Sequence, residues 1–497
     1  MKTILFNARE QSSSGGEVRV AILDTQDGAQ KLLDLDIESE QREKNKGNIY
    51  RGVVMNIEPS LQAAFVNYGG QRHGFLPAGD IAPEAYREEA PKNPRQVTDM
   101  LKRRQAITVQ VVKDEIGNKG AALTTFISLP GRYLVLMPGS DMKGISRKIE
   151  SEEERQRIRE LTASLEPPPG FGIIVRTAGL NQPKTALAQD LKYLLKLWAA
   201  IEKKIEDAEA PALIHHEQDI TLRTLRDYLT PDVERIVFDT PESLKNAREF
   251  VKQVAPKLVR ALELYSGEQS IFTAFGVEAQ VESLYEPRVA LSGGGSIIIE
   301  PTEALVSVDV NSGKMTKPRD HEETAFATNL EAASEVARQL RLRDLGGIIV
   351  IDFIDMESSA HKSEVEKRLR EGVKNDKARI KIGHISPNGT LELTRQRIRS
   401  TLAGGVTVPC SHCGGTGVRR SPNSENARVM RALADKLAAE APFEGARVVV
   451  ESHPDLALRL LNDRRKELAE LEQRYLVPIS VVTKAGQESF AIVIHKS

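Results

Sequence analysis

The sequence predicts a multidomain α/β (α+β) protein, and three observations support this fold class. The chain has 497 residues, which is too long for one hydrophobic core, so several domains are expected. Between Ile49 and Thr125, short apolar stretches separated by glycines and polar turns predict a small barrel. Between Val289 and Arg397, two apolar strands flank a long amphipathic helix, which predicts a compact α/β unit.

Composition limits the class of protein further. Hydrophobic residues make up 40% and charged residues 28% of the chain, as in soluble globular proteins. No apolar run reaches the roughly 18 residues of a transmembrane segment, and the opening MKTILFNAREQ turns polar too early for a signal peptide. The 2 cysteines cannot form a disulfide framework, so we expect a cytoplasmic protein. The net charge of −1 neither supports nor excludes RNA as a partner, and any nucleic-acid surface must be local.

The five short strands between Ile49 and Thr125 favour an OB-fold barrel. Such barrels bind single-stranded nucleic acid by stacking its bases on aromatic side chains beside basic residues. Phe65 and Phe75 are the candidate aromatics, and Lys119 lies in the loop IGNKG. The alternative is that both phenylalanines belong to the barrel core.

Periodicity predicts further elements outside the barrel and the compact α/β unit. Apolar residues at helical spacing predict a helix from about Thr185 to Asp207. The segment DVERIVFDTPESLKNAREF predicts a strand and a helix that could return to the sheet begun near Val18. The tail after residue 424 predicts a small α/β domain in the order helix, strand, helix and two strands.

The compact α/β unit carries acidic residues where its strands end. Asp309 and Asn311 end the strand ALVSVDVNSGK, and Asp352 and Asp355 end the strand GGIIVIDFIDM. A strand–helix–strand unit joins parallel strands, so both strands present their carboxyl ends at one edge of the sheet. Two ionised carboxylates roughly 5 Å apart repel each other by about 3 kcal/mol at an effective dielectric near 20. Such a pair shares a proton or holds a cation.

A hard divalent ion with oxygen ligands, Mg²⁺ first, fits Asp309 and Asp352, with Asn311 as a helper. The alternative is that both aspartates only cap the turns after their strands. Beside a candidate nucleic-acid barrel, a magnesium site predicts phosphodiester hydrolysis, in which metal-bound water supplies the hydroxide and the ion offsets charge on the phosphate.

The two cysteines, Cys410 and Cys413, lie in the stretch VPCSHCGGTG. A C-x-x-C before glycines is typical of one half of a structural zinc site, which needs four ligands. The site could be completed by His412 or another histidine, and a redox dithiol is a further alternative. A redox C-x-x-C normally opens a helix, which GGTG after Cys413 disfavours.

Long segments of the chain occur in an order that points to a family: NIYRGVVMNIEPSLQAAFVNYG, GNKGAALTTFISLPGRYLVLMP, GIIVRTAG, SVDVNSGK, NLEAASEVARQLRLRDLGGIIVIDFIDM and CSHCGGTG. In this order they resemble the ribonuclease E/G family of bacterial endoribonucleases, from the first residues to about Gly417. The tail resembles the family's small domain more loosely. The resemblance implies hydrolytic cleavage of single-stranded, A/U-rich RNA with Mg²⁺, leaving 5′-monophosphate and 3′-hydroxyl ends, in rRNA and tRNA processing and mRNA decay.

The resemblance also implies residue roles. Asp309 and Asp352 are the metal-binding catalytic pair, and Asn311 orients Asp309 or the phosphate. The remaining roles fall on two groups: Phe65, Phe75 and Lys119 contact RNA, and Arg176, Thr177, Gly131, Val135 and Arg379 form a pocket for a 5′-monophosphate. An arginine fork with a hydroxyl is what a dianionic terminal phosphate needs. Without the family, an exposed salt bridge is the better interpretation of Arg176.

The family organisation predicts the domains. They are an RNase H-like domain in two parts (1–42 and 222–285), an OB-fold RNA-binding domain (43–125), a 5′-phosphate sensor domain (126–221), a DNase I-like catalytic domain (286–403), a zinc-link (404–420) and a small C-terminal domain (421–497). In the family, two chains each give two thiolates to one shared Zn²⁺. The resemblance therefore implies a zinc-linked homodimer through Cys410 and Cys413, with pairs of dimers forming a homotetramer.

The chain also departs from the larger family members. It stops near 500 residues, so we expect neither their long degradosome scaffold tail nor its membrane-tethering helix, and in length it is closer to the ribonuclease G-type members. The basic loop SGKMTKPRD after Asn311 differs from some members, which bears on substrate preference. The alternative function is a non-catalytic RNA-binding assembly factor that uses only the barrel and the zinc knuckle.

Overall fold

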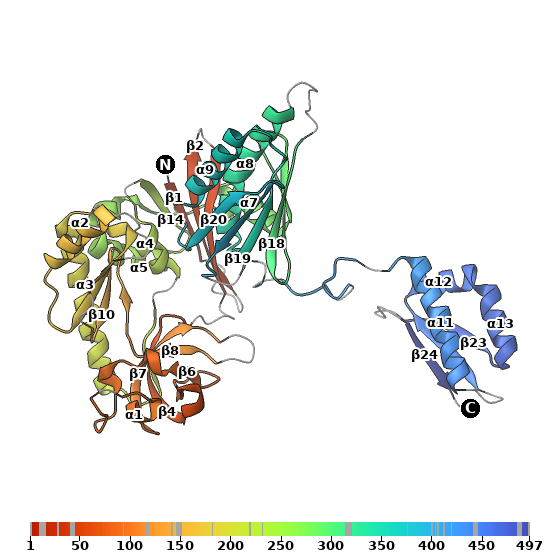
Figure 1. Cartoon of the computed structure of the whole chain (residues 1–497), viewed down its shortest axis with the longest axis horizontal. Helices are drawn as coiled ribbons and strands as arrows, with labels where there is room; N and C mark the ends of the chain where they lie inside the picture. Colours follow the sequence, from red (N-terminus) through yellow and green to blue (C-terminus); the bar gives the residue numbers. More distant parts are fainter. Residues whose placement is uncertain are drawn as a thin grey trace. The chain divides into compact units, whose positions relative to one another are not determined.

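The computed structural model separates the chain into two compact units, Met1–Leu402 and Ala403–Ser497, and each is described by itself (Figure 1). The structure describes residues 2–8, 16–26, 29–39, 45–92, 94–115, 120–140, 143–145, 152–180, 182–217, 220–230, 232–313, 321–374, 376–398, 401–402, 404, 407–410, 413–418, 420–440, 446–484 and 490–495. In this part of the chain, no helix has both the length and the apolar character needed to cross a bilayer.

The first sheet joins the N-terminus to a segment more than 200 residues away in sequence. Its strand order is β15-β14-β1-β2-β3, with β1 at Lys2–Asn7, β2 at Glu17–Gln26, β3 at Ala29–Ser39, β14 at Val233–Phe238 and β15 at Leu262–Leu264. Strand β14 pairs in parallel with β1, which confirms the predicted return to the first sheet.

Both faces of this first sheet carry buried side chains because successive apolar residues alternate between them. Ile4 and Phe6 pack with helices on one face, whereas Leu5 packs with a second group of helices on the other. The flanking helical segments are α4 (Ile220–Tyr228), α5 (Pro241–Val254), η6 (Pro256–Ala261), α6 (Ile271–Ala274), α7 (Glu278–Glu282) and η7 (Ser283–Tyr285).

The predicted barrel is present and closed. Its strands are β4 (Ile49–Glu58), β5 (Ala63–Asn67), β6 (Gly74–Pro77), β8 (Ala122–Thr124) and β7 (Ala106–Lys113), and β7 pairs with β4 to close the ring. Short turns of helix complete it: η2 (Pro59–Leu61), η3 (Ala78–Asp80), η4 (Pro83–Ala85) and α1 (Val97–Met100). The arrangement is OB-like, as predicted.

A third sheet, in the order β11-β12-β10-β9, follows the barrel, and a long helix packs against it. Its strands are β9 (Leu129–Pro130), β10 (Leu134–Pro138), β11 (Lys143–Ile145) and β12 (Phe171–Val175). Its helical segments are α2 (Glu152–Ala163), η5 (Thr177–Gly179) and α3 (Lys184–Asp207), and α3 covers the predicted range. Strand β13 (Ala212–His215) then returns to pair with β4 of the barrel.

The compact α/β unit contains a sheet of six strands in the order β16-β17-β18-β19-β21-β20. The strands are β16 (Arg288–Ala290), β17 (Ser296–Pro301), β18 (Leu305–Asn311), β19 (Gly347–Asp352), β20 (Ile380–Ile385) and β21 (Thr390–Arg395). Helices α8 (His321–Leu342) and α9 (Ser359–Val373) pack on one face of the sheet (Figure 1). On this face the strands contribute a core of valine, isoleucine and leucine. Strands β18 and β19 run parallel, as the strand–helix–strand pattern predicted.

The second unit is a small α/β fold around the sheet β23-β22-β24. Its elements are α11 (Pro422–Glu440), β22 (Arg447–Ser452), α12 (Pro454–Asp463), α13 (Arg465–Tyr475), β23 (Ile479–Thr483) and β24 (Phe490–His495). The sequence predicted one helix between β22 and β23, but the structure has two. The break falls at Arg464, whose ψ of 14° is not helical.

Candidate active site

The aspartates that end the two parallel strands lie side by side. Asp309 on β18 and Asp352 on β19 are register partners, and both are exposed. Their neighbours Val308, Val310 and Ile351 are buried on the opposite face, against α8 and α9. Paired positions of adjacent strands direct their side chains to the same face, so both carboxylates stand on the open face of the sheet.

Asn311 follows Asp309 by two residues and therefore lies on the same face of β18. Its Nδ2 donates a hydrogen bond of 2.6 Å to Oδ2 of Asp309. The bond fixes one oxygen of the carboxylate and leaves the other oxygen to a ligand. Asp309, Asn311 and Asp352 are together called the carboxylate edge below.

Gly389 is a residue of this region that the sequence reasoning missed. Its φ is +81°, and a Cβ atom there would lie 3.2 Å from Oδ1 of Asp355 and 4.0 Å from Oδ1 of Asp352. Its carbonyl accepts a 3.2 Å hydrogen bond from the backbone N–H of Phe353. The segment PNGT is a turn signal that could have identified a glycine turn, but not its closeness to the carboxylates.

The carboxylate edge fits a magnesium ion by the chemistry of its donors. Two carboxylates and an amide present only hard oxygen ligands on the open face of the sheet. Within the described residues, no group of three or more His, Cys, Asp or Glu side chains is placed to hold a metal. Mg²⁺ is compatible with this, because it is usually held by one or two carboxylates and keeps several water ligands.

Arg176 lies at the end of β12 and is held by two acceptors. Its Nη1 donates a 2.5 Å hydrogen bond to the carbonyl of Gly131, and its Nη2 contacts Oδ1 of Asp227 at 2.8 Å. Asp227 lies on α4, and no sequence pattern predicted its contact with Arg176, because the two residues are 51 positions apart. The salt bridge that the sequence suggested for Arg176 is therefore present. The side chain is half-buried rather than exposed.

Asp227 also contacts two further cations. Lys377 approaches its Oδ2 at 3.4 Å, and Arg226 approaches Oδ1 at 3.3 Å. Burial would raise the pKa of Asp227, but Lys377, Arg226 and Arg176 more than offset it and hold the pKa well below its usual range. Arg176, Arg226, Asp227 and Lys377 are called the arginine cluster below.

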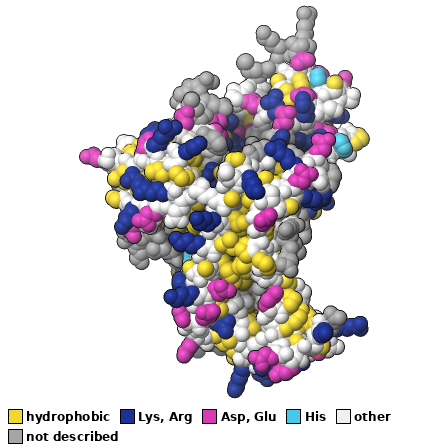
Figure 2. All heavy atoms as spheres, turned by 90° about the vertical axis from the view of Figure 1, so that its left-hand side faces the viewer, with side chains coloured by type: hydrophobic (Ala, Val, Ile, Leu, Met, Phe, Trp, Pro, Cys, Tyr) yellow, Lys and Arg dark blue, Asp and Glu magenta, His cyan; other side chains and the backbone are white. Residues whose placement is uncertain are grey.

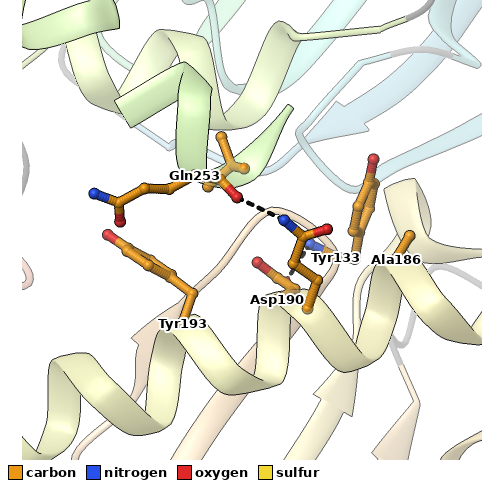
Figure 3. A pocket seen from close by; sticks show the side chains of 7 residues that line it. Tyr133, Ala186, Asp190, Tyr193 and Gln253 are labelled. Carbon is orange, nitrogen blue, oxygen red and sulfur yellow. Dashed lines mark hydrogen bonds between the residues drawn. The ribbon is translucent and has the colours of Figure 1, made fainter. Parts of the chain in front are cut away.

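The turn that carries Gly131 is built around a buried carboxylate. Asp190 on α3 is 5% exposed and accepts hydrogen bonds from the backbone N–H groups of Arg132, Tyr133 and Leu134. A Cβ atom on Gly131 would lie 2.7 Å from Oδ2 of Asp190, so this position requires glycine. Figure 3 shows Asp190 beside Tyr133 in a small cavity that Tyr193 and Gln253 also line.

The other predicted members of the phosphate pocket are Thr177, Val135 and Arg379, which come from three places in the chain. Thr177 follows it directly and is exposed at the start of η5. Val135 lies on β10 and pairs with Ile174 of β12. Arg379 is exposed and comes two residues after Lys377, a member of the arginine cluster.

Phe65 and Phe75 are cross-strand partners on β5 and β6 of the barrel. Their ring centroids are 5.9 Å apart at an interplanar angle of 66°, and both side chains are only partly buried. They are not among the residues of the barrel core, so the core alternative does not account for them. Lys119 lies outside the described residues.

Charge on the surface of the chain is mixed. Figure 2 shows Lys and Arg side chains interspersed with Asp and Glu over one face, with apolar side chains gathered between them. This agrees with the net charge of −1. Any nucleic-acid surface therefore depends on local features such as the two phenylalanines rather than on the overall field.

Cys410 is exposed and Cys413 is half-buried, and neither forms a disulfide. The backbone N–H of Gly417 lies 3.2 Å from Sγ of Cys413, and this bond, with others from Gly415 and Cys410, lowers the pKa of the Cys413 thiol. Residues 413–415 form a turn rather than a helix, as expected from GGTG. His412 lies outside the described residues.

The fold and the two polar sites define a multidomain protein in which an OB-like barrel accompanies an α/β sheet with paired carboxylates. The chain belongs to the ribonuclease E/G family. The model of the "Ribonuclease E/G family" matches residues 128–398, and that of the "RNase E/G, Thioredoxin-like domain" matches residues 409–497.

Curated relatives agree with this membership. The chain is 45% identical to ribonuclease E of Haemophilus influenzae over 98% of its own length and 51% of that protein. It is 46% identical to ribonuclease E of Escherichia coli over 95% of its own length and 44% of that protein. It is 35% identical to ribonuclease G of Escherichia coli over 96% of its own length and 97% of that protein. The chain thus spans about half the length of the ribonuclease E relatives and nearly all of the ribonuclease G relative.

Proposed function

We propose that the chain is a Mg²⁺-dependent endoribonuclease that hydrolyses single-stranded, A/U-rich RNA to products with 5′-phosphate and 3′-hydroxyl ends. The observation that carries this proposal is the register pairing of Asp309 with Asp352 on the open face of the sheet. Relatives named ribonuclease E and ribonuclease G add support, since their similarity covers nearly the whole chain.

The residues of the carboxylate edge divide the chemistry among them. Asp309 and Asp352 would hold the ion, and Asn311 keeps Asp309 oriented through its 2.6 Å hydrogen bond. A Mg²⁺ ion held by these residues would activate water for the attack and would offset the charge that develops on the phosphate. The open face of the sheet gives an RNA backbone access to both carboxylates, because neither is covered by a helix.

The barrel is proposed to hold the RNA strand beside the site. Phe65 and Phe75 are only partly buried, so their rings are accessible to bases. Base stacking is worth about 1–3 kcal/mol per base and tolerates any base. A preference for A/U-rich RNA then follows from the ease with which such RNA stays single-stranded, and Lys119 would add a phosphate contact.

The arginine cluster is proposed to be part of a pocket for a 5′-monophosphate, which stimulates cleavage. Gly131 and Asp227 orient the guanidinium of Arg176, so its binding geometry exists before a ligand arrives. Thr177 would add a hydroxyl, Arg379 a second cation, and Val135 an apolar wall. This pocket would favour RNA fragments that carry a 5′-monophosphate over primary transcripts or 5′-hydroxyl RNA.

Cys410 and Cys413 are proposed to give two thiolates to a Zn²⁺ shared with a second copy of the chain, with two such dimers forming a tetramer. Two sulfurs per chain supply the four ligands that a structural zinc needs only when two chains combine. Metal analysis tests this: one zinc per two chains is expected, and Cys410→Ser should lose both the zinc and the dimer. One zinc per chain would contradict sharing.

The domain assignments are part of the same proposal. The first sheet, built from two distant segments, is the RNase H-like domain, and the six-stranded sheet with α8 and α9 is the DNase I-like catalytic domain. The domain that contains β9 to β12 is the 5′-phosphate sensor. The proposed cellular roles are rRNA and tRNA processing and mRNA decay, in the cytoplasm.

Cleavage of a 5′-labelled single-stranded RNA with Mg²⁺, and again with excess EDTA, tests the activity. We expect internal cleavage only with Mg²⁺ and none of a matched DNA. Intact RNA in the presence of Mg²⁺, with RNA still bound, would instead identify the non-catalytic RNA-binding assembly factor. Cleavage of the DNA at the same rate would remove the specificity for RNA.

A further inference from the structure

The segment from Asp352 to the start of α9 at Ser359 carries three acidic residues, Asp352, Asp355 and Glu357, on an irregular backbone. Phe353 and Met356 anchor it in the core, while Asp352 and Asp355 are exposed. No ladder of strand hydrogen bonds follows Asp352 in this stretch, so its shape has to be set by contacts with other segments.

Two residues of α8, Glu322 and Asn329, make those contacts, and Phe326 on the same helix contacts the start of α9. Glu322, Phe326 and Asn329 are spaced by four and three residues, so they lie on one face of the helix. Glu322 accepts hydrogen bonds from the backbone N–H groups of Glu357 at 2.9 Å and Ser358 at 3.2 Å. The ring of Phe326 stacks on the ring of His361 at 4.1 Å.

Asn329 makes the contact nearest to the carboxylates. Its Nδ2 donates to the carbonyl of Ile354 at 2.8 Å, and its Oδ1 accepts from the backbone N–H of the same residue at 3.0 Å. The side chain is 0% exposed, so water cannot replace either bond. The amide carries both a donor and an acceptor, so one side chain satisfies the carbonyl and the N–H of the same residue.

Ile354 lies two residues after Asp352 and directly before Asp355. The residue before it, Phe353, is held by the carbonyl of Gly389, so the backbone is fixed from α8 on one side and from the turn before β21 on the other. The two fixed residues leave the segment little freedom, and the direction of the Asp352 carboxylate depends on that segment.

We infer that Asn329 is a positioning residue of the metal site, which acts through the backbone of Ile354 to hold the carboxylate edge in the geometry that binds a divalent cation. The inference rests on the proposed function. Partners that orient metal ligands from behind commonly change metal affinity by about 10- to 100-fold when removed. Asn329 has no contact with the RNA or the ion in this role.

The test is the affinity of the full-length, RNA-free protein for Mn²⁺, measured from the electron paramagnetic resonance signal of the free ion. We expect Asn329→Leu, which keeps the branching of the side chain but removes both hydrogen bonds, to weaken the site by about 10- to 100-fold. Hydrogen exchange measured by mass spectrometry on the peptide that spans Ile354 should become faster in the same variant. Asn329→Ser serves if the leucine variant does not fold.

Gln339→Leu is the matched control. Gln339 is a buried amide on the same helix, 2% exposed, but its hydrogen bonds go to Glu335 and Arg343 rather than to the segment after β19. Mn²⁺ affinity in this control should stay within about twofold of wild type. Asp352→Asn defines the background from other surface carboxylates.

The outcomes separate failure of the inference about Asn329 from failure of the proposed metal site. A folded Asn329 variant with wild-type affinity would overturn the inference alone, as would an equal loss in Gln339→Leu, which would indicate general loosening of α8. Wild-type protein that binds Mn²⁺ no better than Asp352→Asn would overturn the proposed metal site, and the inference with it.

Discussion

The carboxylate edge and the arginine cluster differ in how the charge of their carboxylates is compensated. At the carboxylate edge, two acidic residues are register partners on an exposed face, and the hydrogen bond described for Asp309 comes from the neutral amide of Asn311. In the arginine cluster, one carboxylate, that of Asp227, is largely buried and contacts three cations.

This difference indicates which site depends on an ion. Repulsion between the two carboxylates would be relieved by the proposed cation, so under this proposal the carboxylate edge depends on its ion. The arginine cluster is already compensated, and Asp227 orients Arg176 whether or not a phosphate is present. Changes at the first site should therefore affect cleavage of every substrate, and changes at the second should affect only the discrimination of 5′ ends.

The largest expected effect is that of Asp352→Asn. The substitution keeps the shape of the side chain but removes a charge that the metal requires, at a cost of several kcal/mol in the transition state. We expect cleavage to fall by about a thousandfold for 5′-monophosphorylated and 5′-hydroxyl RNA alike. Rates under single-turnover conditions, with RNA binding measured in parallel, provide the check.

RNA affinity in Asp352→Asn should remain within a few-fold of wild type, because the barrel is unchanged. Nearly normal cleavage by the Asp352→Asn variant would mean that Asp309 and Asp352 only cap the turns after their strands. That outcome would remove the contrast between the two sites.

The second effect is that of Arg176→Gln on the ratio of rates for 5′-monophosphorylated and 5′-hydroxyl RNA. Hydrogen bonds to a charged group are worth about 1.5–3 kcal/mol, so the ratio should fall by about 10- to 100-fold, toward one. Cleavage of 5′-hydroxyl RNA should hardly change.

Arg235→Gln is the control for this ratio. Arg235 also pairs with a carboxylate, Glu263 at 2.7 Å, but both side chains are exposed, and they lie on β14 and β15 rather than in the arginine cluster. The control should keep the wild-type ratio. A ratio that survives Arg176→Gln would exclude Arg176 from sensing the 5′ end.

The two sites also differ in how well the sequence predicted them. Asp309 and Asp352 could be found because apolar strands around a helix predict parallel pairing, and pairing puts strand ends together. The barrel and the long helix from Lys184 to Asp207 followed from periodicity in the same way. These features depend on local pattern plus one general rule of topology.

Asp227, Asn329 and Gly389 could not be found by such reasoning. Asp227 is one of many acidic residues on amphipathic helices, and its role depends on Arg176 and Lys377, which come from separate segments. Asn329 looks like an ordinary polar residue of α8 until its contact with Ile354 is known. Contacts between distant segments leave no periodic trace in a sequence.

The third effect is that of Gly389→Ala, which tests the space beside the carboxylate edge. Gly389→Ala should reduce cleavage by about tenfold, because a positive φ costs about 1–3 kcal/mol for most residues and the new Cβ atom would displace Asp355. The control Gly276→Ala has a φ of +67° but no atom within 4 Å of the added Cβ. Thermal unfolding and cleavage are measured on both variants.

The backbone cost should lower the melting temperature of both glycine variants by similar amounts, while cleavage falls only in Gly389→Ala. Equal activity in the two variants would show that space beside Asp355 does not matter to the site.

The smallest effect is a pH dependence of 5′-end discrimination. The pKa of Asp227 lies below its usual range, so its ion pairs contribute stability that is present above the ordinary aspartate pKa of about 4 and lost only as pH falls through the lowered value. Between about pH 5 and 8, the carboxylate of Asp227 therefore stays ionised, and the arginine and lysine side chains stay protonated. The terminal phosphate, in contrast, loses its second charge near pH 6.

The ratio of rates for 5′-monophosphorylated and 5′-hydroxyl RNA should thus fall a few-fold as pH drops from about 7.5 to about 5.5, since a monoanion makes weaker charge-assisted hydrogen bonds. Taking the ratio cancels the pH dependence of the cleavage step, which acts on both substrates through the carboxylate edge. Arg176→Gln should show a flat ratio over the same range. A wild-type ratio that stays constant through pH 6 would mean that the pocket binds the monoanion equally well, and that the compensated charge of the arginine cluster does not select for the dianion.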